Sequence, residues 1–70
     1  MLVRKYARLY CLAENAEDKL DILIRLLEIE PALQEVFGVD IDEFDNFDVF
    51  DIYDWIEEND QNIKDIFKEL

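Results

Sequence analysis

The sequence contains no histidine, no serine and no threonine, and these absences exclude several kinds of active site. There is no serine or threonine nucleophile, no phosphorylation switch on those residues and no attachment serine for a phosphopantetheine arm. The histidine that serves as general base in most hydrolase triads is also missing. Nothing singles out one carboxylate pair among the nineteen acids for acid–base catalysis. We therefore expect a protein that is not an enzyme, with no catalytic residue and no cofactor.

Cysteine and long apolar runs are also scarce. Cys11 is the single cysteine, which excludes an internal disulfide and a zinc site built from several cysteines. We interpret it as a small buried apolar side chain. No apolar run approaches the roughly 20 residues that a helix needs to cross a bilayer, and Arg4, Lys5 and Arg8 interrupt the N-terminal segment, unlike a secretory signal. These features predict a soluble cytoplasmic protein, in its own cell or in an infected host.

What is present is a helical pattern of apolar residues. They make up 51% of the chain, which is too many for intrinsic disorder despite a net charge of −12. They recur at helical spacing, and 70 residues suffice for one domain with a small core. The sequence therefore predicts an all-α fold, a single helical domain over residues 1–70. Its four to five short helices are expected at about 2–13, 16–29, 31–37, 49–58 and 60–69.

Short capping and breaking motifs set these boundaries. Asn15 suits the N-cap of the second helix, and Pro31 ends that helix because the residue before a proline avoids helical geometry. Gly38 suits the left-handed position that ends the third helix. Asp48 is expected to cap the fourth helix, and the Asn-Asp pair at 59–60 to separate the fourth helix from the fifth.

The acidic residues are concentrated in the second half of the chain. Between Leu26 and Ile63 there are thirteen aspartates and glutamates and no lysine or arginine. Within this stretch an aspartate and an aromatic ring each recur at every third position. Three residues advance about 300° around an α-helix, so five such aspartates cannot share one face of a continuous helix, and a break near Asn46 is expected. The residues concerned are Asp42, Asp45, Asp48, Asp51 and Asp54, with Phe44, Phe47, Phe50 and Tyr53.

The fourth predicted helix would carry its carboxylates on one face. Asp51, Asp54 and Glu58 follow one another at offsets of about 4.5 and 6 Å along the axis, given a rise of about 1.5 Å per residue. Duplex DNA carries about one phosphate charge per 1.7 Å of axis, so this row is dense enough to engage the cations of a nucleic-acid-binding cleft. Phe50 and Trp55 flank the row as aromatic anchors. With a second acidic row before the helix, the candidate partner-binding residues are Asp42, Asp45, Phe50, Asp51, Asp54, Trp55, Glu57 and Glu58.

Acids at alternate positions raise the alternative of an EF-hand calcium loop that starts at Asp40. Phe44 then stands at a ligand position and cannot ligate, and Asp45 stands where the loop needs a glycine. Asp51 would replace the bidentate glutamate that closes the loop. We therefore expect no metal site.

The sequence thus predicts a non-catalytic acidic protein that occupies the basic, nucleic-acid-binding surface of a partner protein. By composition, and not by any motif, it parallels DNA-mimic inhibitors such as anti-restriction, anti-CRISPR and nuclease-immunity proteins. The alternative is a small helical adaptor or accessory subunit that binds through an apolar helix face, with acidity serving only solubility. An ordinary solvated acidic surface is a third interpretation.

Charge limits the remaining partners. The net charge of −12 argues against direct binding to nucleic acid or to an anionic membrane, although a few bases lie near the N-terminus.

The apolar stripe of the second predicted helix covers more than half of its circumference. A homodimer through the first or second helix is therefore a further expectation.

Overall fold

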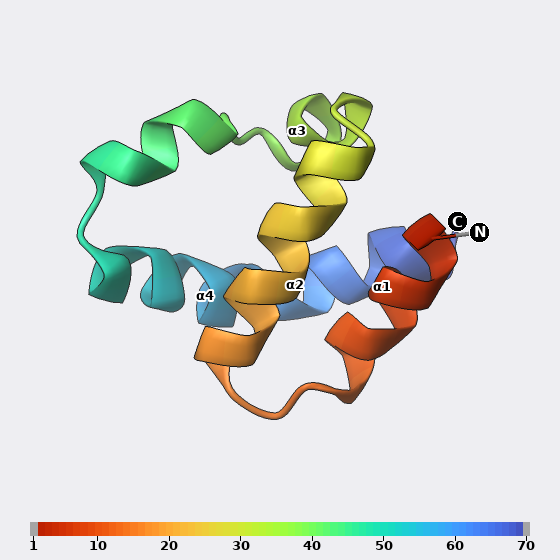
Figure 1. Cartoon of the computed structure of the whole chain (residues 1–70). Coiled ribbons are helices and arrows are strands. Elements are labelled where there is room, and N and C mark those ends of the chain that lie inside the picture. Colours follow the sequence, from red (N-terminus) through yellow and green to blue (C-terminus); the bar gives the residue numbers. More distant parts are fainter. Residues whose placement is uncertain (1, 70) are drawn as a thin grey trace.

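The computed structural model describes residues 2–69, apart from the side chain of Asp45, and this part of the chain is helical except for short connections (Figure 1). It has four α-helices, one 3-10 helix and no strand within residues 2–69, so the predicted all-α fold is confirmed. α2 contacts α1, α3 and α4, while α1 also packs against α4. No helix in the described range is long and apolar enough to span a bilayer. The elements are α1 (Leu2–Leu12), α2 (Ala16–Ile29), α3 (Ala32–Phe37), η1 (Ile41–Asn46) and α4 (Val49–Lys68).

The core lies where α1, α2 and α4 meet. Leucines of α2 and isoleucines of α4 fill it, and Tyr10 contributes a ring from α1. The ring of Phe67 packs edge-on against Tyr10, with 5.2 Å between centroids, and against Phe37 of α3, with 5.5 Å. Full burial of one such side chain stabilises a fold by about 1.5–3 kcal/mol. The fully buried large side chains are Tyr10, Leu23, Leu26, Leu27, Ile56 and Ile63.

The helix ends in the first two thirds of the chain follow the sequence signals. The Asn15 side chain accepts a main-chain hydrogen bond from the first turn of α2 at 2.8 Å, and Asp48 does the same for α4 at 2.9 Å. Both predicted N-caps are confirmed. Gly38 ends α3 with a φ of 72°, a left-handed conformation that a Cβ would strain. η1 ends at Asn46, and the extended backbone of Phe47 separates it from α4, as expected.

The prediction of two helices separated at residues 59–60 is wrong, because α4 runs unbroken over 20 residues. The Asn59 side-chain amide donates a hydrogen bond to the main-chain carbonyl of Trp55, one turn earlier in α4, at 2.8 Å. The side chain thus binds to the helix and does not interrupt it. Asparagine and aspartate have a low intrinsic helix propensity, but the tertiary packing of α4 outweighs it. An apolar stripe continues through the expected break and keeps one face of α4 in the core: Ile52, Ile56, Ile63 and Phe67.

Asp60 joins three helices through one carboxylate. It pairs with Lys19 of α2 at 2.9 Å and with Lys64 of α4 at 3.0 Å, and it accepts a hydrogen bond from the Tyr10 hydroxyl of α1 at 3.1 Å. Burial opposes the charged form, yet these hydrogen bonds together lower the pKa of Asp60 below its ordinary 3.8. Burial, and then the hydrogen bond to Asp60, raise the pKa of Tyr10 well above its ordinary 10.0.

The start of α1 and the end of α4 lie at the same end of the molecule (Figure 1). Arg4 and Arg8 of α1 and Lys68 of α4 line a pocket of about 210 Å³ there. We call this end the basic pole. Cys11 also lines the pocket and is exposed, so its expected burial is wrong, because the core-facing side of α1 is centred on Tyr10 instead. η1 and the first half of α4 lie at the opposite end of the ribbon (Figure 1).

Candidate partner-binding surface

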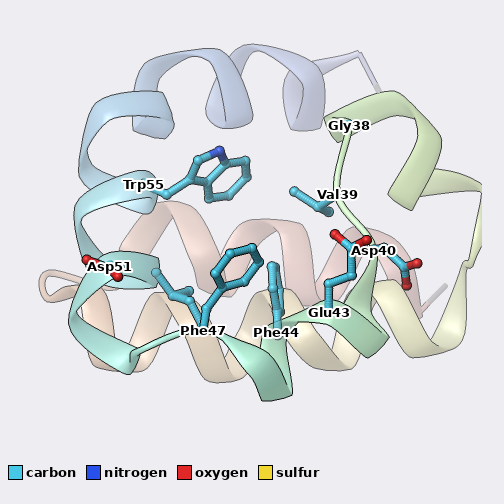
Figure 2. A pocket seen from close by; sticks show the side chains of 9 residues that line it. Gly38, Val39, Asp40, Glu43, Phe44, Phe47, Asp51 and Trp55 are labelled. Atoms are coloured by element: carbon cyan, nitrogen blue, oxygen red, sulfur yellow. The ribbon is translucent and has the colours of Figure 1, made fainter.

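A cavity of about 280 Å³ lies between η1 and the first half of α4 (Figure 2). The side-chain carbonyl of Gln34 accepts a hydrogen bond from the Ile41 N–H at 3.1 Å, and its amide donates to the Leu27 carbonyl at 3.4 Å. Gln34 thereby ties the start of η1 to the end of α2. The Asp40 carboxylate caps η1 by accepting from the Asp42 N–H at 3.0 Å. We call this cavity the ring cavity, after the aromatic side chains that line it: Phe44, Phe47 and Trp55.

The lining of the ring cavity is mostly apolar. Figure 2 shows the rings of Phe44 and Phe47, from η1 and the turn that follows it, pointing toward the same space as the indole of Trp55. Val39 and Ile52 complete the apolar lining. Trp55 is half-buried whereas Phe47 is 55% exposed, so the rings that line the cavity differ in their access to solvent.

Three carboxylates border the ring cavity, and no cation among the described residues forms an ion pair with them. Asp40 and Glu43 lie on the η1 side, and Asp51 lies across from them on α4 (Figure 2). All three are exposed, and no described lysine or arginine lies within ion-pair distance of them. The described ion pairs converge on Asp60 instead. The border of the ring cavity is therefore a region of negative potential.

Among the predicted partner-binding residues, the structure brings Asp51 and Trp55 together at the ring cavity. Phe50 lies outside the lining and is 71% exposed, with its ring edge-on to Tyr53 at 6.2 Å between centroids. The two rings that were predicted to flank the acidic row therefore differ in environment. Trp55 belongs to a cavity wall, and Phe50 projects into solvent.

The predicted carboxylates lie on two elements. Asp42 is exposed on η1, and Asp45 belongs to the same element, although its side chain lies outside the described part of the chain. The acids of α4 that were predicted to share a face are all exposed and have no described cation beside them. We call these four residues the acidic face: Asp51, Asp54, Glu57 and Glu58.

Sequence reasoning did not identify the η1 half of the ring cavity. Asp40 fits the first position of an EF-hand loop that the rest of the segment does not support, and no pattern indicates that Val39, Asp40 and Glu43 border a cavity. The triplet spacing does mark Phe44 and Phe47, but their position at the cavity depends on how η1 folds back toward α4. No local spacing encodes that tertiary arrangement.

The described side chains include no group of three or more cysteines and acids arranged to hold a metal ion. No protein-family model, curated protein or solved structure matches this chain. The surface therefore has to be interpreted from its chemistry: carboxylates without cations beside an open cavity lined by rings. Such a surface is suited to bind a positively charged partner that also brings apolar groups.

Proposed function

We propose that this protein is a non-catalytic binding protein whose acidic face occupies the basic, nucleic-acid-binding surface of a partner protein. One observation carries the proposal: the described carboxylates of η1 and of the first half of α4 have no described lysine or arginine at ion-pair distance, and they lie in the same stretch of the chain as exposed apolar side chains. Acids that served only solubility would gain nothing from exposed rings nearby, which favour association. These exposed apolar side chains are Phe47, Val49 and Phe50.

Charges and rings would act at different stages of binding. The carboxylates of the acidic face raise the rate of encounter with a basic surface and orient the approach. Phe50 then supplies apolar contact area that slows dissociation, as aromatic anchors do at protein interfaces. The partner is inhibited because its nucleic-acid site is occupied, which is how anti-restriction, anti-CRISPR and nuclease-immunity proteins of the DNA-mimic type act.

Affinity capture from the source cell or its host tests this proposal. The immobilised chain should retain a nucleic-acid-binding protein at low salt, release it at high salt and release it to added duplex DNA, because exposed charges are screened by salt. The double variant Asp54→Lys, Glu58→Lys reverses two charges of the acidic face and should lose at least nine tenths of the retained partner. Unchanged retention by this variant, with an unchanged thermal melt, would exclude charge mimicry.

A matched control separates local charge from net charge. The double variant Glu28→Lys, Glu35→Lys changes the net charge by the same amount at exposed positions of α2 and α3, outside the acidic face and the ring cavity. It should retain the partner almost as well as the natural chain. If both double variants lose binding equally, the partner responds to overall charge and not to the acidic face.

The exposed leucines of α1 favour a second function, that of an adaptor or a homodimer which binds through an apolar helix face. Leu2, Leu9 and Leu12 are 56%, 40% and 70% exposed and recur at roughly helical spacing on α1. Glutamate at Leu9 and Leu12 should abolish this kind of binding at every salt concentration. Sedimentation of the natural chain and of the Leu9→Glu, Leu12→Glu variant would also reveal a dimer that depends on this face.

A further inference from the structure

A protein whose carboxylates imitate the phosphates of DNA does not need a cavity such as the ring cavity. A row of carboxylates can engage lysines and arginines from a plain helix surface, whereas this molecule places three rings and two aliphatic side chains behind its acids. We propose that the ring cavity receives one arginine side chain of the partner. This inference rests on the proposed function in one respect, namely that the partner presents a basic surface.

The size of the ring cavity selects a single side chain as the occupant. Its volume of about 280 Å³ lies just below the range of about 300–1,000 Å³ that holds drug-sized ligands and cofactors. Its lining is apolar, and its border carries Asp40, Glu43 and Asp51. An occupant that matches the apolar lining and the acidic border has an apolar stem and a positively charged end. The long basic side chains, lysine and arginine, have this form.

Arginine fits this arrangement better than lysine. Its planar guanidinium stacks on aromatic faces, and the indole of Trp55 is the kind of ring that attracts cations most strongly. The guanidinium is also more weakly hydrated than an ammonium, so it loses less when it enters an apolar cavity. Its fork of N–H donors can bind a border carboxylate such as Glu43 through two hydrogen bonds, and no described cation competes for that carboxylate.

Fluorescence of Trp55 offers a direct test, because it is the only tryptophan of the chain and lines the cavity. N-acetyl-argininamide should change the Trp55 emission in a saturable way at millimolar concentration. N-acetyl-citrullinamide, which has nearly the same shape without the charge, should bind at least tenfold more weakly. N-acetyl-lysinamide should fall between the two. Equal binding of the arginine and citrulline probes, or no saturable change with either, would overturn the inference.

Two variants test whether the arginine probe binds in the ring cavity. Val39→Phe fills the cavity without changing any charge and should abolish the response to the arginine probe. Glu43→Gln replaces an exposed border residue and should weaken that probe at least threefold. If Val39→Phe does not fold, Glu43→Gln decides alone, and unchanged affinity in this variant contradicts the proposal. A Trp55 emission that changes with protein concentration, together with a dimer in sedimentation, would identify a second copy as the occupant and also overturn it.

The partner experiment separates this inference from the proposed function. Capture that is lost in Asp54→Lys, Glu58→Lys but kept in the folded Val39→Phe and Glu43→Gln variants would support the acidic face and overturn the role of the cavity. Capture that survives the charge reversals would refute the proposed function. In that case the titration of Trp55 with the arginine and citrulline probes still decides whether the cavity binds a guanidinium.

Discussion

At the scale of single residues, Asp60 differs from the acids of the acidic face in its surroundings. Its carboxylate meets two ammonium groups and a phenol, and the Lys19 ammonium also lies 5.8 Å from the centre of the Tyr10 ring. The acids of the acidic face are exposed and have no described cation beside them. The first arrangement stabilises the fold, and the second leaves charge available to a partner. Burial and pairing thus separate a structural acid from candidate binding acids.

Removal of the Asp60 charge should destabilise the protein. The Lys19 side chain is only 13% exposed, so Asp60→Asn leaves its ammonium without a counter-charge where water reaches it poorly. We expect a loss of about 1–3 kcal/mol in the free energy of unfolding, measured by urea denaturation at pH 7. Asp65→Asn is the control, because Asp65 is exposed on the same helix, and it should stay within about 0.5 kcal/mol of the natural chain. Equal stability of the two variants would show that the Asp60 cluster contributes nothing.

The same residue predicts an acid-dependent loss of stability. The folded pKa of Asp60 is lowered, so its contribution is complete above the ordinary pKa of 3.8 and is lost as pH falls through the lowered folded value. The difference in unfolding free energy between the natural chain and Asp60→Asn should therefore be largest near pH 7 and shrink below pH 3.8. Urea denaturation of both proteins between pH 7 and pH 3 measures this. A gap that stays constant throughout would refute it.

At the scale of helices, the sequence predicts the elements that local chemistry determines and misses those that packing determines. The caps at Asn15 and Asp48 and the stop at Gly38 act on their own neighbours, so their residue types suffice to locate them. The continuity of α4 through Asn59 depends on distant partners, including a lysine of α2 that pairs with the next residue. The ring cavity also depends on tertiary structure, since η1 has to fold back toward α4. The η1 side of the candidate site could therefore not be predicted from the sequence.

Packing also predicts which element opens first. The described side chains between Leu33 and Ile52 are half-buried or exposed, whereas α2 and the middle of α4 carry the fully buried ones. Main-chain amides over 41–50 should therefore exchange with solvent deuterium through local opening, and those of residues 23–27 only through global unfolding. Hydrogen exchange followed by NMR measures both classes. N-acetyl-argininamide should slow exchange in the first class only. Uniform protection along the chain would contradict this prediction.

At the scale of the whole molecule, charge is distributed unevenly between two ends. The bases Arg4, Arg8 and Lys68 line a pocket at one end, and the acids of η1 and the first half of α4 lie toward the other. The long dimension of the molecule is only 31 Å, so the acids also repel one another within a small volume. Net stability should then depend on ionic strength.

Salt should stabilise the free protein while it weakens partner binding. Repulsion among exposed carboxylates is screened beyond about 8 Å at physiological ionic strength. The thermal midpoint should therefore rise as sodium chloride is raised from low concentration to that level. The Asp54→Lys, Glu58→Lys variant should respond less, because part of the repulsion is already removed. A midpoint that stays flat or falls with salt would show that repulsion among the acids does not limit stability.

The shared position of the first turn of α1 and the last turn of α4 has a practical consequence. An affinity tag, a surface tether or a fused reporter that is joined before the first turn of α1 or after the last turn of α4 would be attached next to the basic pole. On a sensor surface the acidic face and the ring cavity would then project into solution. Immobilisation through either end should give the same kinetics of partner binding, so the choice of tag position does not constrain the search for that partner.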